Sequence, residues 1–244
     1  MELSDNTVLV TGGGSGIGLA LAKAFAMSNS TVVVCGRNAK KLEAVHKESP
    51  AIVAYPCDIA SDQDQQRLVE HIAQKHPNLN ILINNAGIQH NYDFSDTKSH
   101  TNLIEEEVNI NFLAHVKLTD RLLPILLGRP SAAIVNITSA LALVPKQSAP
   151  IYCATKAAMH CFTKALRYQL ERTPVKVFEI IPALVDTEMT KGRGKGKITP
   201  ETLASEALRG IESNKYEIRI GKTKVLFALN RFLPSVAERI IRDG

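Results

Sequence analysis

Three side chains in the middle of the chain have the types and spacing of a proton-transfer site. Tyr152 and Lys156 stand four residues apart, and Ser139 lies upstream of both. Residues at this spacing share one face of a helix, so an ammonium would lie beside a phenol. A free tyrosine has a pKa of about 10, and a nearby cation lowers that pKa because it favours the phenolate. The trio is a candidate acid/base device in which Ser139 bonds a substrate oxygen. Two solvated side chains are the alternative, because the motif needs structural context.

The order of apolar segments predicts the elements that would position these residues. Short runs rich in Val and Ile, without alternation, indicate strands buried on both faces. They alternate with longer amphipathic runs, which is typical of a parallel sheet wound in both directions. We expect strands at Thr7–Thr11, Thr31–Cys35, Ile52–Tyr55, Ile81–Ile83, Ala132–Ile137, Val175–Ile181 and Tyr216–Ile220, and helices at Ile17–Met27, Ala39–Lys47, Asp62–Lys75, Leu103–Leu127, Pro150–Arg172 and Pro200–Ile211.

No composition shift marks a domain boundary. We therefore predict a single α/β domain over residues 1–244, a Rossmann-like doubly wound parallel sheet of about seven strands with helices on both faces.

Composition fits a globular protein and excludes several classes. The chain has 244 residues, of which 45% are hydrophobic and 22% charged, an ordinary balance. It has no apolar run long enough to span a membrane, and its polar start, Met1–Asp5, is not a secretory signal. The cysteines form no Cys-x-x-Cys pair and the histidines show no metal-ligand spacing, so we expect no metal. We expect buried free thiols in a reducing, cytoplasmic compartment at Cys35, Cys57, Cys153 and Cys161.

The net charge of +5 is concentrated near the C-terminal end. Residues 187–244 contain twelve Lys/Arg and seven Asp/Glu. This bias is no nucleic-acid signature, although it could attract cofactor phosphates or acidic lipid. Segment 187–200 is rich in glycine and cations, and we predict a flexible substrate lid, with an ordinary surface loop as the alternative. The amphipathic tail 222–244 could lie on a membrane surface. Packing against the chain's own core or a partner subunit is favoured, because Pro234 would end or kink a helix.

A glycine-rich loop follows the first predicted strand. Gly12, Gly16 and Gly18 open the first helix. Free N–H groups at a helix N-terminus bind phosphate, and glycines let the backbone approach it. The spacing differs from G-x-G-x-x-G and lacks the Lys-Ser/Thr of a nucleoside-triphosphate loop. In this α/β context the loop predicts dinucleotide binding, with a tight strand–helix turn as the alternative.

The end of the second predicted strand indicates which dinucleotide binds. Proteins of this architecture that bind NAD usually carry an acid there for the ribose hydroxyls, whereas this chain has Gly36 and Arg37. An arginine suits a 2′-phosphate through charge-assisted hydrogen bonds. We predict NADP in preference to NAD, the alternative being that Arg37 is an ordinary exposed charge.

Together these motifs resemble those of the short-chain dehydrogenase/reductase family over roughly Asn6 to Ile220. The matching segments are Thr11-Gly-x-x-x-Gly-x-Gly18, Asn84–Gly87, Asn111, Ser139 and Tyr152-x-x-x-Lys156. The resemblance implies that Tyr152 is the catalytic acid/base, that Lys156 lowers its pKa and holds the nicotinamide ribose, and that Ser139 orients the substrate carbonyl. It also implies that Asn111, preferred to Asn109, anchors a proton-relay water.

The resemblance further implies the cofactor contacts. Asp58 would meet the adenine, Ile17 the phosphates, and Val185 and Thr187 the carboxamide. Together with the glycine loop and Arg37, the full predicted set is Gly12, Ser15, Gly16, Ile17, Gly18, Arg37, Asp58, Asn84, Ala86, Gly87, Tyr152, Lys156, Val185 and Thr187. One departure is Ala183, which stands where the family usually has glycine. Because alanine resists some backbone conformations that glycine permits, we expect a small local shift there.

The implied reaction is a reversible, NADP-dependent hydride transfer between nicotinamide and a carbonyl or secondary alcohol, with Tyr152 exchanging the proton. Apolar residues in 140–147 and 184–190 favour a small-molecule substrate with an apolar arm. The family implies homodimers or homotetramers through the helices at 103–127 and 150–172. A non-catalytic cofactor-binding regulator or scaffold on the same fold is the alternative. We also expect Glu105–Glu107 to stabilise the start of the long helix.

Overall fold

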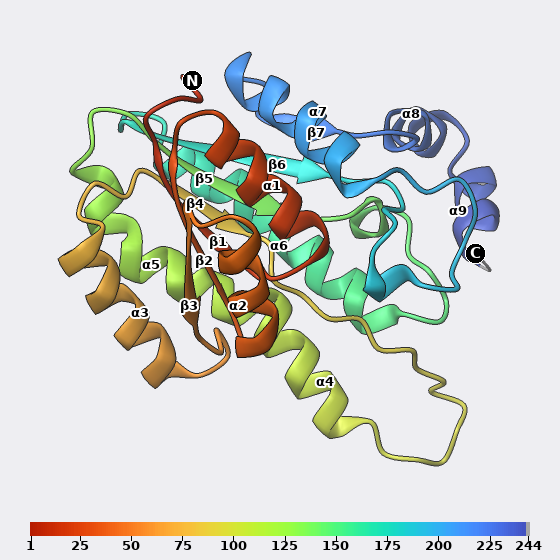
Figure 1. The fold of residues 1–244 in the computed structure, drawn as a ribbon. Helices are drawn as coiled ribbons and strands as arrows, with labels where there is room; N and C mark the ends of the chain where they lie inside the picture. Colours follow the sequence, from red (N-terminus) through yellow and green to blue (C-terminus); the bar gives the residue numbers. More distant parts are fainter. Residues whose placement is uncertain (243–244) are drawn as a thin grey trace.

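A seven-stranded parallel sheet forms the centre of the molecule, for which a computed structural model describes residues 1–242 (Figure 1). The sheet order is β3-β2-β1-β4-β5-β6-β7, and every pairing is parallel. The strands are β1 Thr7–Thr11, β2 Thr31–Gly36, β3 Ile52–Pro56, β4 Ile81–Asn84, β5 Ala132–Ile137, β6 Val175–Ile181 and β7 Glu217–Arg219. This arrangement confirms the predicted Rossmann-like α/β sheet.

Helices cover both faces of this sheet (Figure 1). The helices are α1 Gly16–Met27, α2 Ala39–Glu48, α3 Asp62–Lys75, α4 Thr101–Val108, α5 Ala114–Leu127, α6 Pro150–Gln169, α7 Pro200–Glu212, α8 Thr223–Phe232 and α9 Pro234–Arg242. Helices α1, α2 and α7 pack on one face, and α3, α5 and α6 on the other.

Two hydrophobic cores explain why the strands lack an apolar–polar alternation. Val8 and Val10 of β1 point into the core under α1, whereas Leu9 points into the opposite core. Phe25 of α1 and Leu118 of α5 are fully buried on the two sides. Both faces of each central strand therefore need apolar residues. Truncating one such side chain to alanine costs about 2–5 kcal/mol.

The order of the strands places a ligand crevice between β1 and β4. The chain winds outward from β1 through β2 to β3, and then crosses back to β4 on the other side of β1. Ligands of open α/β sheets bind where the winding reverses, at the carboxyl ends of the strands. The glycine loop follows β1 at this point, and the segment 85–88 follows β4.

The long helix expected at 103–127 is interrupted. Residues Asn109–Leu113 form a π-helical turn between α4 and α5, so Asn111 sits in a widened stretch of helix. Such turns occur mostly as single insertions inside α-helices, frequently at functional sites. Glu105–Glu107 do not open this helix, which begins at Thr101. The expectation that they stabilise the helix start is wrong.

The C-terminal tail folds into two helices that break at Pro234, as proline's missing N–H predicts. Ala237 of α9 is fully buried, and the carbonyl of Arg242 accepts a hydrogen bond of 3.1 Å from the N–H of Gln147. Helix α9 thus lies against the loop that follows β5. Residues 243–244 of the predicted tail lie outside the described residues. Within residues 1–242, no helix is long and apolar enough to cross a membrane.

The cysteines only partly match the expectation of buried thiols. Cys35, Cys57 and Cys153 are buried and free, whereas Cys161 is free but exposed on α6.

Candidate active site

The glycine loop packs closely against the segment that follows β4. Gly12 has a φ of +66°, and a Cβ there would lie 2.9 Å from the Cα of Ala86. A Cβ on Gly18 would lie 2.5 Å from the carbonyl oxygen of Gly12. Glycine is required at both positions by the packing of β1, α1 and the loop after β4. Ser15, Gly16 and Ile17, at the N-terminus of α1, line a cavity at the carboxyl edge of the sheet.

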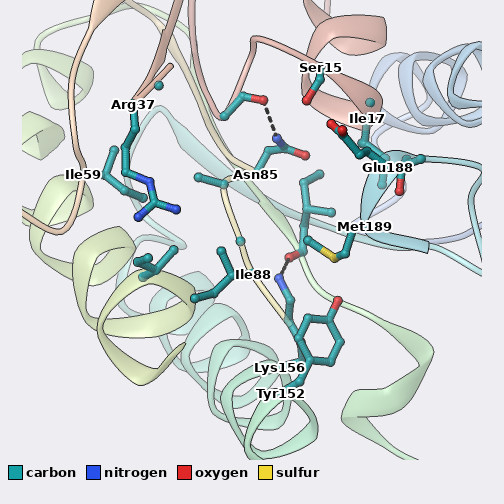
Figure 2. Close-up of a pocket in the computed structure, with 18 of the residues that line it drawn as sticks. Ser15, Ile17, Arg37, Ile59, Asn85, Ile88, Tyr152, Lys156, Glu188 and Met189 are labelled. Atoms are coloured by element: carbon teal, nitrogen blue, oxygen red, sulfur yellow. Dashed lines mark hydrogen bonds between the residues drawn. The ribbon is translucent and has the colours of Figure 1, made fainter. Parts of the chain in front are cut away.

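A first cavity runs along the carboxyl ends of the central strands. Figure 2 shows Arg37 and Ile59 on one side of it, and Tyr152, Lys156 and Met189 on another. The sequence-predicted residues that line it are Gly12, Ser15, Gly16, Ile17, Arg37, Asp58, Ala86, Gly87, Tyr152, Lys156 and Thr187. The cavity is also lined by residues outside the predicted set of cofactor contacts: Gly36, Cys57, Ile59, Asn85, Ile88, Ile110, Ile137, Thr138, Pro182, Glu188 and Met189.

Asn84, expected to contact the cofactor, faces the interior instead. Its Nδ2 donates to Thr119 Oγ1 at 3.0 Å and to Asn136 Oδ1 at 2.8 Å, so its side chain ties the sheet to α5. The next residue, Asn85, lines the cavity and donates from Nδ2 to the carbonyl oxygen of Thr11 at 2.9 Å. Successive side chains of a strand point to opposite faces, so only one of the two asparagines can face the ligand.

Two more predicted contacts lie outside the first cavity. Gly18 supports the loop from behind, where it packs against Gly12 and Asn85. Val185 lines a second cavity.

Asn111 is buried in the π-helical turn and holds the segment after β4. Its Oδ1 accepts from the N–H of Ile88, and its Nδ2 donates to the carbonyl of Ile88, both at 2.9 Å. A Cβ on Gly87 would lie 3.2 Å from Asn111 Oδ1 and 3.8 Å from Lys156 Nζ. The amide and the ammonium thus border the same glycine. Asn109 points elsewhere, with Nδ2 3.5 Å from the carbonyl of Ala60.

Tyr152 and Lys156 lie on one face of α6, as their spacing predicts. The Nζ of Lys156 is 5.6 Å from the ring centroid of Tyr152 and donates to the carbonyl of Ile137 at 2.9 Å. Burial lowers the pKa of Lys156 to about 8, because it disfavours the ammonium.

The pKa of Tyr152 is higher than the sequence suggested. Burial raises it to about 12, and the hydroxyl of Ser139 acts in the opposite direction. Among the charged groups, Glu107 raises this pKa and Arg193 lowers it. Burial outweighs the groups that lower the pKa, so the lowered phenol pKa expected from the sequence is not found.

The second cavity adjoins the first at Tyr152. Ser139 borders it, and the Oγ of Ser139 accepts a hydrogen bond of 3.1 Å from the N–H of Leu141. Of the apolar residues in the ranges 140–147 and 184–190, which were expected to favour an apolar substrate arm, Leu141 and Leu184 form walls of this cavity, whereas Leu143 and Val144 do not line it. Ile17, Tyr152, Pro182, Thr187 and Met189 border both cavities.

Ala183 causes no backbone strain. Its φ is not positive, and its N–H donates to the carbonyl of Ile220 at 3.2 Å. Gly221 takes the left-handed conformation opposite it, with a φ of +65°.

Two buried carboxylates near the site have no sequence signal of their own. Glu179 on β6 accepts from Thr138 Oγ1 at 2.6 Å and contacts His160 Nδ1 at 2.9 Å. The hydrogen bond with Glu179 raises the pKa of His160. Glu107 is also buried and accepts from the hydroxyl of Tyr92 at 2.7 Å.

The doubly wound sheet, with adjoining cavities at its carboxyl edge, is the architecture of a Rossmann-like oxidoreductase. The short chain dehydrogenase family model matches residues 6–197, and the chain belongs to that family of enzymes. Among curated relatives, it is 41% identical over 224 residues, 89% of each chain, to the uncharacterized oxidoreductase DltE of Bacillus subtilis (strain 168).

Solved structures show the same fold. A short chain dehydrogenase from Burkholderia cenocepacia J2315, in complex with NADP, has a TM-score of 0.87 at 22% identity over 100% of both chains. The 3-ketoacyl-(acyl-carrier-protein) reductase from Brucella melitensis, complexed with NADH, has a TM-score of 0.83 at 26% identity, covering 91% of this chain and 99% of that one. Structural neighbours thus carry either form of the nicotinamide cofactor.

Proposed function

We propose that this protein is an NADP-dependent oxidoreductase that reversibly transfers a hydride between the nicotinamide and a carbonyl or secondary alcohol. The observation that carries the proposal is the position of Tyr152, whose side chain borders both cavities. One cavity begins at the N-terminus of α1, and the other is bounded by Ser139 and apolar side chains. A group held between them would meet a cofactor on one side and a substrate on the other.

The first cavity fits a dinucleotide. The N-terminus of α1 would hold the pyrophosphate, because Gly12, Ser15, Gly16 and Ile17 line this end of the cavity and free N–H groups at a helix N-terminus bind phosphate. Asp58 and Ile59 line the cavity after β3, where the adenine would lie. Thr187 and Lys156 line the part nearer Tyr152 and would hold the nicotinamide half.

Arg37 is the basis for proposing NADP over NAD. It lines the first cavity directly after β2, beside Gly36, where no acid is present. Its Nη1 lies 3.5 Å from Glu106 Oε1, and both side chains are about half exposed, at 52% and 41%. Exposed pairs of this length contribute little. A 2′-phosphate would therefore compete easily with Glu106 for the guanidinium.

The chain's own residues would handle the proton. The cofactor supplies or accepts the hydride when bound. In reduction, the hydroxyls of Tyr152 and Ser139 would hydrogen-bond the carbonyl oxygen, and Tyr152 would donate its proton as the carbon accepts the hydride. Its pKa of about 12 keeps the phenol protonated at neutral pH, which suits reduction. Lys156 and Asn111 would restore that proton from solvent, and oxidation would run these steps in reverse.

The assembly of these polar groups supports an enzyme over a non-catalytic regulator or scaffold. A cofactor-binding scaffold needs the first cavity but has no use for Ser139 and Tyr152 at the border of a second one. A panel of ketones and aldehydes, followed at the nicotinamide absorbance with NADPH and NADH, tests the proposal. Turnover with a higher kcat/KM for NADPH supports it. Tight NADPH binding without turnover of any panel member would favour the scaffold.

We further propose a single-domain, cytoplasmic protein that assembles as a homodimer or homotetramer through α4–α5 and α6. The surface is supported by exposed apolar side chains: Leu103 on α4, Leu113 in the π-helical turn, Leu127 on α5 and Tyr168 on α6. Light scattering behind a sizing column tests it: a monomer at micromolar concentration would contradict the assembly.

A further inference from the structure

Arg193 places a guanidinium at the second cavity, and one of its nitrogens has no partner among residues 1–242. It belongs to segment 187–200, between Gly192 and Gly194, whose positive φ values turn the chain there. Its Nη1 is buried and has no hydrogen-bond partner in the described part of the chain. No ion pair within residues 1–242 involves Arg193. Burying a guanidinium nitrogen without a partner is costly, so the position points to an anion that completes it.

The location of Arg193 separates this anion from the cofactor's phosphates. Arg193 lines the second cavity and not the first, which holds the N-terminus of α1 and Arg37. Its charge nevertheless reaches Tyr152, because it lowers the pKa of that phenol against the larger effect of burial. An anion at Arg193 would thus belong to the molecule whose carbonyl lies at Tyr152.

The rest of the second cavity defines the remaining chemistry. Its residues include two further cations, Lys146 and Lys195, and no Asp or Glu. Leu141, Leu184 and Ile241 provide apolar surface, the last from α9. The tail therefore forms part of the cavity wall. A ligand that fits this lining has an acidic group, a carbonyl and an apolar chain.

We propose that the substrate is an oxo acid, whose carboxylate binds the Arg193 guanidinium while its ketone or aldehyde lies between Ser139 and Tyr152. The planar fork of arginine matches a carboxylate in bidentate geometry. The apolar chain of the acid packs along Leu141, Leu184 and α9. This inference rests on the proposed oxidoreductase function and names the substrate class of the same site.

Kinetics with matched substrates test the proposal. Wild-type protein with NADPH is assayed on 2-, 4- and 5-oxohexanoate, on their methyl esters and on 2-hexanone. At least one acid is expected to exceed its ester about tenfold or more in kcat/KM, the range of a charge-assisted hydrogen bond. Arg193→Gln should abolish that preference, measured as the ratio of kcat/KM for each acid to kcat/KM for its ester, so that a general effect of the substitution on turnover cancels. A phosphate-bearing ketone of similar size shows whether the site instead prefers a phosphoryl group, which would overturn the choice of carboxylate.

Lys191→Gln is the matched control. Lys191 is exposed in the same segment and does not line the second cavity, so its loss removes one positive charge without removing the buried group. The acid preference should survive in this variant. Equal rates on acids and esters in the wild type, or the same loss in both variants, would overturn the proposal.

A binding experiment keeps the two proposals distinguishable. Hexanoate, which has no carbonyl to reduce, is titrated calorimetrically into the NADPH-loaded wild type and Arg193→Gln. The variant is expected to bind about tenfold more weakly, and equal affinities would contradict the anion site. Turnover of 2-hexanone without any acid preference would refute only the substrate class. Absence of turnover on every compound, with NADPH bound, would refute the oxidoreductase function itself.

Discussion

The ammonium of Lys156 donates to the carbonyl oxygen of Ile137 at 2.9 Å, and it is not directed at the hydroxyl of Tyr152 one helical turn away. The last residue of β5 therefore fixes the lysine, and the phenol and the ammonium share a cavity without sharing a hydrogen bond. Both groups carry shifted pKa values for the same reason, since burial disfavours their charged forms.

The pKa of Lys156 predicts how reduction depends on pH. Because burial lowers this pKa to about 8, the ammonium loses its proton as pH rises through that value. If Lys156 supplies the proton that Tyr152 delivers, kcat/KM for carbonyl reduction should be flat below pH 7 and fall above about pH 8. A pH profile at saturating NADPH measures this limb. If kcat/KM stays constant up to pH 10, Lys156 does not supply the proton that Tyr152 delivers.

The buried ammonium of Lys156 should destabilise the fold, although turnover needs it. Its folded pKa lies below the value in an unfolded chain, so the unfolded state binds more protons between about pH 8 and 10.5, and the fold gains stability as pH rises through that range. At pH 7 Lys156 is charged in both states, so burial of its ammonium lowers the free energy of unfolding by the full amount. Lys156→Met should therefore raise the melting temperature by a few degrees at pH 7 while it abolishes turnover. A destabilised variant would show that the hydrogen bond to Ile137 outweighs the burial of the charge.

The pair of His160 and Glu179 should stabilise the fold in acid. The hydrogen bond with Glu179 raises the folded pKa of His160 above about 6.5, so the stabilisation is fully present below pH 6.5 and is lost as pH rises through the folded pKa. His160→Asn should cost about 1–3 kcal/mol at pH 6 and less at pH 8.5. Denaturant unfolding at both pH values measures the difference. If the difference in unfolding free energy between the wild type and His160→Asn is the same at both pH values, His160 stays neutral.

Arg37 should set the choice of cofactor. Arg37→Gln is expected to lower kcat/KM with NADPH about 10- to 100-fold, since a charge-assisted contact to phosphate is lost. The value with NADH should change little. Lys40→Gln, an exposed neighbour on α2 that does not line the cavity, is the control and should leave both values unchanged. Equal losses with the two cofactors in Arg37→Gln would assign Arg37 a structural role.

The sequence predicted the scaffold well because its signals are local. The runs at Ala132–Ile137 and Val175–Ile181 became β5 and β6 with the expected bounds, since buried Val/Ile strands end at polar or Pro residues. The proline break at Pro234 is equally local. The π-helical turn at Asn109–Leu113 leaves no such signal, because one widened turn barely changes the apolar periodicity.

The parts of the site that were missed depend on distant partners. Whether Asn84 or Asn85 faces the cavity follows from the register of β4 in the sheet. In the sequence, Glu179 is a polar residue within a strand. Its burial is explained by its contacts with His160 and Thr138, which are distant in the sequence. The composition of segment 187–200 indicated cations near the site, but it did not indicate which cations line the second cavity. One of them is Arg193, which lies between two glycines of positive φ.

In the proposed function, Tyr152 transfers the proton at the junction of a cofactor cavity and a substrate cavity. Tyr152→Phe tests this role, with kcat for ketone reduction and the NADPH dissociation constant measured on the same preparation. The phenyl ring keeps the packing of α6 but has no proton to give. We expect kcat to fall about 100- to 10,000-fold, the range of general acid–base catalysis, while the dissociation constant changes less than about threefold. A variant that keeps near wild-type turnover would contradict this role.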